Sequence, residues 1–178
     1  TTKDVDVLLQ TSHQDVHQLL IYAAWLNAGD WFQFEITQST DDTPDRFGGL
    51  RFYTQSLLDG RLFERFHIDV GIGDPVVEPA EYLAMPALLE FADIPATIVP
   101  CYPLTQQLAE KIHAYTRPHP SGESSRVKDL VDILLMAKLK NLSGQRLFQA
   151  VQTTFEVRQT HSLPLQLSTP PSAWAATF

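Results

Sequence analysis

The sequence has almost no cysteine and no long apolar run. Its single cysteine, Cys101, excludes an intrachain disulfide and a cysteine cluster for zinc. No stretch of the 178 residues approaches the roughly 20 apolar residues of a membrane helix, and no basic segment followed by an apolar one resembles a secretion leader. These absences predict a cytoplasmic protein without a membrane partner.

Positive charge is also scarce, and it is unevenly distributed. Thirteen Lys and Arg residues stand against 21 Asp and Glu, a formal net charge of −8 that argues against a general nucleic-acid coat. Residues 111–146, however, contain seven basic and three acidic residues, a local balance of +4. Such a segment can bind nucleotide phosphates or one RNA end, or it can simply be a solvated helix surface.

The hydrophobic pattern predicts an α+β fold. The chain is long enough for one domain or two small ones. Alternating and helical spacing of apolar residues predicts a mixed α/β sheet core in residues 1–101 and a helical part in residues 102–178. The two parts can also pack as one domain. The expected strands are 4–9, 31–37, 50–58, 62–71 and 96–101, and Asp59-Gly60 predicts a type I′ hairpin turn between the third and the fourth. The expected helices are 12–28, 104–116, 124–142 and 144–158. We expect loops at 41–49 and 117–123, a connection with one short helix around 87–91 in residues 74–95, and an irregular tail from Ser162.

Acidic residues mark the polar faces of two predicted strands. Asp4 and Asp6 are two residues apart, so they share a face of the first strand. Neighbouring carboxylates repel each other unless a cation lies between them, and Mg²⁺ accepts such ligands together with substrate phosphates. Asp69 occupies the polar face of another strand and can complete a divalent-metal site. The alternatives are a solvated strand face, or zinc bound by His67 and Asp69, for which no further His or Cys completes the set.

Basic and acidic residues also recur in the helical part. Lys111 follows the apolar position Leu108 by three residues and can reach a triphosphate as a point charge or face solvent. Lys128 and Asp132 are four apart, so an intrahelical ion pair is the alternative to a functional role. Asp129 near the start of its helix also suits the helix dipole. Lys111 and Asp129 are 18 residues apart across a Pro/Gly loop, so we expect two adjacent antiparallel helices to bring them together at the cleft of the sheet acids.

The loop between these two helices adds two cations. Arg117 and Arg126 flank a segment containing Pro118, Pro120 and Gly122. They are candidates for phosphate or RNA contacts.

Four segments together resemble one family. They are TKDVDV at 2–7, HIDV at 67–70, AEKIHAYTR at 109–117 and RVKDLVDI at 126–133. In this order they are similar to AbiEii-type nucleotidyltransferases, which are toxins of type IV toxin–antitoxin and abortive-infection systems with a polymerase-beta-like fold. The resemblance covers residues 2–158, and its most specific part is the Lys-Asp-x-x-Asp segment after Glu-Lys-x-x-Ala.

The resemblance implies roles for most of these residues. It makes Asp4 and Asp6 a metal-binding pair, Asp69 the accompanying sheet acid, Lys111 a nucleotide contact and Asp129 a second functional acid. Catalysis is accordingly assigned to Asp4, Asp6, Asp69, Lys111 and Asp129. Nucleotide or RNA binding is assigned to Lys3, Lys111, Arg117, Arg126, Lys128 and Asp132. The implied reaction moves a nucleotidyl group from a nucleoside triphosphate to a hydroxyl such as a tRNA 3′ end, with Mg²⁺ as cofactor and a cognate antitoxin as partner.

One element of the family is missing from the sequence. Relatives carry a Gly-Gly or Gly-Ser turn upstream of Asp-x-Asp, where backbone N–H groups cradle the triphosphate. This sequence begins at Thr1, without that turn and without an initiator Met. We therefore expect poor transfer by a chain that starts at Thr1 and recovery on upstream extension. The alternatives are a truncated, inactive relative acting as a binding or interaction protein, and a metal-dependent hydrolase, for which no water-activating base can be singled out.

Overall fold

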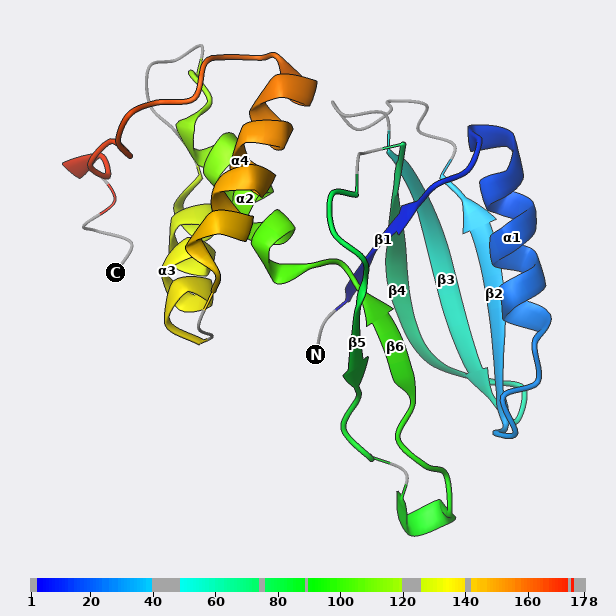
Figure 1. Ribbon diagram of the computed structural model, residues 1–178. Coiled ribbons are helices and arrows are strands. Elements are labelled where there is room, and N and C mark those ends of the chain that lie inside the picture. The colour runs from blue at the N-terminus through cyan, green and yellow to red at the C-terminus, as the bar shows by residue number, and fades with distance from the viewer. Residues whose placement is uncertain are drawn as a thin grey trace. The chain divides into compact units, whose positions relative to one another are not determined.

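The chain forms two compact units. The computed structural model describes residues 3–39, 49–73, 76–88, 90–119, 126–139, 142–172 and 174. One unit comprises Thr1–Asp74 with Phe91–Ile94, and the other comprises Pro75–Glu90 with Pro95–Phe178 (Figure 1). The predicted α+β class is confirmed. The predicted loop at 41–49, apart from Gly49, and Phe178 lie outside the described residues.

A four-stranded mixed sheet dominates the first unit. Its strands are β1 (Asp4–Leu9), β2 (Phe32–Gln38), β3 (Leu50–Leu58) and β4 (Arg61–Ile72), in the spatial order β1-β4-β3-β2. β1 pairs with β4 in parallel, and the other neighbours are antiparallel. Each of these strands agrees with its sequence prediction to within one residue at either end.

One helix covers one face of this sheet. Helix α1 (His13–Trp25) lies against the sheet (Figure 1). Its Val16 packs against Phe52 and Val70, and all three side chains are nearly inaccessible to solvent. The helix ends three residues before the predicted Ala28. Beyond it the side chain of Asn27 accepts a hydrogen bond from the Gly29 N–H, a local turn that competes with helix continuation. α1 is the only α-helix described in this unit, so no described α-helix of the unit packs on the opposite sheet face.

The β3–β4 turn has the left-handed backbone that its sequence predicts. Asp59 and Gly60 have φ values of 49° and 72°, as a type I′ hairpin requires. A Cβ at Gly60 would meet no atom within 4 Å, so a side chain there is opposed by the backbone conformation alone.

Gly60→Ala is therefore expected to destabilise the protein by about 1 kcal/mol, the cost of a left-handed L-residue. Urea unfolding measures the change. Gly144→Ala is the matched control, because Gly144 also has open space but lies in an ordinary helical position. Equal effects of the two substitutions would contradict the strain argument.

The second unit is mainly helical. Its α-helices are α2 (Leu104–Thr116), α3 (Val127–Leu139) and α4 (Gly144–Arg158). α2 and α4 have the predicted bounds. The prediction of a helix over 124–142 is met by α3 over Val127–Leu139, with Arg126 and Leu142 outside the helix, while residues 124, 125, 140 and 141, like 120–123 of the predicted loop, lie outside the described residues. One core group contains Leu108, Tyr115, Ile133 and Trp174, and a second contains Ala109, Ala150, Val151 and Phe155. The tail is irregular as predicted, and its Trp174 ring lies 6.2 Å from that of Tyr115.

One strand was missed by the sequence prediction. β5 (Glu81–Ala84) pairs in antiparallel fashion with β6 (Ile98–Cys101), so part of the expected 74–95 connection is a strand. The four residues of β5 are too few to show an alternating apolar pattern. Their pairing partners in β6 are fourteen or more residues away in the sequence. The expected helix around 87–91 is a 3₁₀ turn at Glu90–Ala92.

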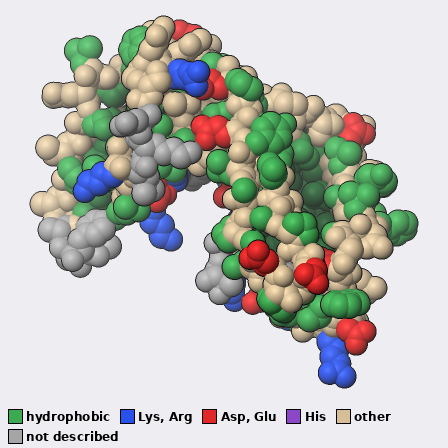
Figure 2. Space-filling model, turned by 60° about the horizontal axis from the view of Figure 1, so that its bottom comes forward, with side chains coloured by type: hydrophobic (Ala, Val, Ile, Leu, Met, Phe, Trp, Pro, Cys, Tyr) green, Lys and Arg blue, Asp and Glu red, His purple; other side chains and the backbone are tan. Residues whose placement is uncertain are grey.

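The surface carries many hydrophobic side chains (Figure 2). Trp25 and Trp31 are 82% and 76% exposed, in contrast to the buried Trp174. No helix in the described part of the chain has the length and apolar character needed to cross a membrane.

Candidate functional site

The parallel pairing of β1 with β4 brings the strand acids together. Asp4 lies opposite His67, and Asp6 lies opposite Asp69. Because strand side chains alternate, these four residues share the sheet face opposite the Val16, Phe52 and Val70 core. As the sequence predicted, Asp69 is on a strand adjacent to β1 and on the same face as Asp4 and Asp6.

Asp69 is held by an arginine of the next strand. Arg51 on β3 lies opposite Asp69, and its Nε and Nη2 each donate a 2.6 Å hydrogen bond to one carboxylate oxygen. The hydrogen bond from Arg51 holds the pKa of Asp69 below its ordinary value, although partial burial acts in the opposite direction. Asp69 is therefore ionised, and both of its oxygens are engaged in a bidentate pair.

Asp4 and Asp6 are open to solvent. The Nδ1 of His67 lies 3.3 Å from Oδ1 of Asp4, whose side chain is 61% exposed. The ring of Tyr53 meets that of His67 edge-on with centroids 4.9 Å apart. Asp6 is also exposed, so its carboxylate is accessible to a ligand from solvent.

The expected three-carboxylate metal site stays a prediction. Nowhere in the described residues do three His, Cys, Asp or Glu side chains gather closely enough to hold a metal ion. Asp4 and Asp6 fit Mg²⁺ by donor type, since both present accessible carboxylate oxygens on one strand face. Asp69 fits as a third ligand only when it exchanges Arg51 for the cation.

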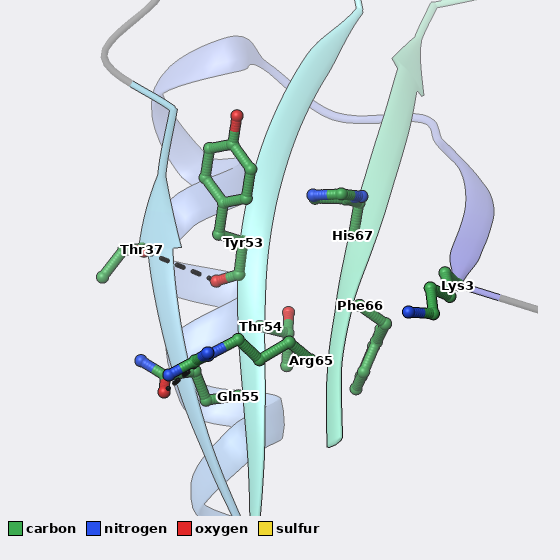
Figure 3. Close-up of a pocket in the computed structure, with 8 residues that line it drawn as sticks. All are labelled: Lys3, Thr37, Tyr53, Thr54, Gln55, Arg65, Phe66 and His67. Carbon is green, nitrogen blue, oxygen red and sulfur yellow. Dashed lines mark hydrogen bonds between the residues drawn. The ribbon is translucent and has the colours of Figure 1, made fainter.

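A hollow of about 380 Å³ lies on the same sheet face beside His67. Its lining comes from β2, β3, β4 and the residue before β1 (Figure 3). The lining residues are Lys3, Thr37, Tyr53, Thr54, Gln55, Arg65, Phe66 and His67. Lys3, assigned to nucleotide or RNA binding from the sequence, is thus placed at this hollow.

A second charged group joins α2 to α3. Nζ of Lys111 lies 2.7 Å from Oδ2 of Asp132 and 3.4 Å from Oδ1 of Asp129. Burial lowers the pKa of Lys111, but the hydrogen bond and charge of Asp132, aided by Asp129, outweigh this and leave the pKa raised. Lys111 is therefore a permanent cation between two carboxylates.

The basic residues near this charged group differ in their contacts and exposure. Arg126 forms an ion pair with Asp129 at 3.5 Å. Lys128 is exposed, and in the described residues Asp132 pairs with Lys111, so the alternative of a Lys128–Asp132 pair is wrong. Arg117 is half-buried at the end of α2. A cleft shared by Lys111 and the sheet acids stays a prediction, because the two groups belong to different units.

Sequence reasoning missed a histidine pair in the helical unit, formed by the buried His113 and the half-buried His161. The Oγ1 of Thr160 lies 2.8 Å from Nε2 of His113 and 2.9 Å from Nδ1 of His161. Nε2 of His161 lies 2.9 Å from the Thr116 hydroxyl. Burial, the charge of His161 and those of Arg158 and Arg117 lower the pKa of His113 to about 4. Both rings are therefore neutral at pH 7, since the pKa of His161 is lowered as well.

A sequence model of a known family matches nearly the whole chain. Its description is nucleotidyl transferase AbiEii toxin, Type IV TA system, and it matches residues 1–176. The chain belongs to the AbiEii nucleotidyl transferase toxin family. The resemblance of the four sequence segments is thereby confirmed.

A solved structure shares the AbiEii chain's fold. MenT4, a nucleotidyltransferase toxin from Mycobacterium tuberculosis H37Rv, superposes with a TM-score of 0.57 at 16% identity. The match covers 92% of this chain and 54% of MenT4, so the chain spans about half the length of that protein. A search of curated proteins found no match.

Arg51 was missed for an identifiable reason. A two-residue Asp59-Gly60 hairpin pairs Leu58 with Arg61 and, continued regularly, would set Arg51 opposite Ile68. A register shift between Ser56 and Leu57 moves Arg51 opposite Asp69 instead. No sequence pattern predicts this register shift.

Proposed function

We propose that this AbiEii-family chain moves a nucleotidyl group from a nucleoside triphosphate to an acceptor hydroxyl, with an RNA end such as a tRNA 3′ terminus as acceptor. The observation that carries the proposal is the β1–β4 register, which sets Asp4, Asp6 and Asp69 on one sheet face not covered by α1. We further propose that the protein acts in the cytoplasm as a toxin opposed by a cognate antitoxin.

In this proposal Asp4 and Asp6 hold Mg²⁺. The ion would neutralise charge on the triphosphate and align it for in-line attack. Arg51 fixes the orientation of Asp69 through its two hydrogen bonds and keeps the carboxylate ionised. When Arg51 is displaced, an Asp69 oxygen becomes free to accept a hydrogen bond from the attacking hydroxyl.

The charged residues of the helical unit supply nucleotide or RNA contacts in the same proposal. Lys111, kept positive by Asp129 and Asp132, attracts phosphate oxygens as a point charge. Arg117, Arg126 and Lys128 are proposed as further phosphate contacts near it. Asp129 and Asp132 then act by positioning the Lys111 ammonium.

A non-enzymatic binding protein is the second candidate. It is favoured by the engagement of both Asp69 oxygens with Arg51, which leaves Asp4 and Asp6 as the accessible members of the predicted acid trio. Such a protein would bind nucleotide or RNA without transferring a nucleotidyl group.

Transfer of labelled nucleotide to RNA tests the proposal. The protein from the complete reading frame is incubated with total RNA, Mg²⁺ and each of the four labelled triphosphates. We expect labelling of RNA with at least one of them, and loss of that labelling when a chelator removes the metal, because the acids cannot neutralise phosphate charge by themselves. RNA or triphosphate binding without labelling by any of the four would favour the binding protein instead.

A further inference from the structure

The hollow on the sheet face is basic although the protein is acidic. Lys3 and Arg65 line it, and its eight lining residues include no carboxylate. Nε of Arg65 donates to the neutral amide oxygen of Gln55 at 3.3 Å. Within the described residues neither cation forms an ion pair, unlike Arg51, which is neutralised by Asp69. The hollow therefore offers two positive charges to an anion.

An exposed aromatic ring lines the same hollow. Tyr53 is 43% exposed, and the edge-on ring of His67 supports it at 4.9 Å. Figure 3 shows the Arg65 side chain extending toward Gln55, with the rings of Tyr53 and His67 further along the sheet. An aromatic face next to cations is the combination that binds the base and the phosphate of a single-stranded nucleotide.

The hollow adjoins the acids of the proposed reaction. His67 lines the hollow and also contacts Asp4 through Nδ1. A magnesium triphosphate needs carboxylate ligands, which the hollow lacks, whereas a phosphodiester needs only cations and N–H donors. The position next to Asp4 suits the strand that presents the attacking hydroxyl.

We infer that this hollow binds one nucleotide of the acceptor RNA strand, with its base on Tyr53 and the phosphates on either side of that nucleotide at Lys3 and at Arg65. The inference rests on the proposed function for the identity of the strand. The chemistry of the hollow, which is two cations and one stacking ring, is independent of whether transfer takes place.

Binding of two probes to matched variants tests the inference. The probes are a fluorescent single-stranded RNA oligonucleotide and a fluorescent triphosphate with Mg²⁺, each followed by anisotropy. The double variant Lys3→Ala/Arg65→Ala should bind the RNA about tenfold more weakly, and its salt dependence should fall by about 0.7 in log–log slope for each cation removed. Triphosphate binding should not change.

Stacking is tested separately on the same probes. Tyr53→Leu should weaken RNA binding about tenfold, whereas Tyr53→Phe should preserve it, because only the ring face is required. Arg61→Ala is the control for the loss of positive charge in the double variant. Arg61 is exposed at the start of β4, the strand that carries Arg65, but it does not line the hollow. Circular dichroism confirms that each variant is folded.

Three results would overturn the inference. They are an absence of RNA binding by the parent protein, an RNA affinity unchanged by the double variant, and an equal loss of triphosphate binding, which would make the hollow a triphosphate site. RNA binding that depends on Lys3 and Arg65 in a protein without transfer would refute the proposed function and the identity of the strand as acceptor, and would leave the hollow as a site for single-stranded RNA.

Discussion

Replacing Asp6 by Asn is expected to reduce nucleotidyl transfer at least about a thousandfold while leaving the fold intact. Asp6 lies opposite Asp69 in the parallel ladder and presents an exposed carboxylate to solvent. Removing one of two accessible metal ligands removes several kcal/mol of transition-state charge stabilisation, which corresponds to such a rate loss. Incorporation of labelled nucleotide into RNA measures the effect.

The stability of the Asp6→Asn variant separates loss of a ligand from loss of structure. The substitution removes one carboxylate from a face that also carries Asp4 and Asp69, so repulsion falls and thermal stability should be unchanged or slightly higher. Titration with Mn²⁺ should show weaker binding. Asp15→Asn is the control. Asp15 on α1 accepts a hydrogen bond from the Ser12 hydroxyl, and the amide oxygen of Asn can still accept it. Transfer by Asp6→Asn at the parent rate would contradict the metal-site proposal.

Acidification from pH 7 to pH 5 is expected to destabilise the helical unit by about 2 kcal/mol through His113 alone. The His113 side chain is 2% exposed, and its pKa falls from an ordinary 6.5 to about 4 in the folded state. Between these two values the unfolded chain binds more protons than the folded one. Stability is therefore fully present above about pH 6.5 and is lost as the pH falls toward 4.

Three neighbouring groups explain why His113 resists protonation. After burial, the largest contributions come from His161, Arg158 and Arg117, whose positive charge would oppose an imidazolium. The pKa of His161 is lowered by burial and by Arg117, so its titration acts in the same direction.

Urea unfolding at several pH values isolates the His113 contribution. Trp25 and Trp31 are highly exposed, so replacing both by Phe leaves Trp174, buried in the helical unit, as the fluorescent reporter. In this background His113→Gln should lose less stability on acidification than the parent, and His161→Gln should show a smaller reduction of the same sign. Equal pH dependence of the parent and His113→Gln would refute this account.

Much of the fold follows from local pattern. Alternation of apolar side chains predicted the four main strands, and the Asp59-Gly60 pair predicted the hairpin that joins β3 to β4. Helical spacing predicted α2 and α4 with their correct ends. These signals succeed because side-chain periodicity and the backbone preference of a turn act within a few residues.

Contacts between distant segments were beyond such reasoning. β5 exists because β6 pairs with it, and its four residues carry no pattern of their own. The His113–Thr160 hydrogen bond joins residues 47 apart, and only the packing of the helical unit brings them together. Lys111 and Asp129 were expected to meet. The packing of α2 on α3 places the Lys111 ammonium closer to Asp132 than to Asp129.

By itself the sequence determined that Asp4 and Asp6 share a strand face, that Asp69 lies on the polar face of its own strand, and that the chain resembles AbiEii toxins. Tertiary structure alone decided what each acid contacts. The irregularity between Ser56 and Leu57 shifts β3 by one residue, and this shift sets Arg51 opposite Asp69. Because a one-residue shift in register changes which residues of a strand lie opposite each other, the partner of a strand residue depends on the whole ladder and not on the local sequence.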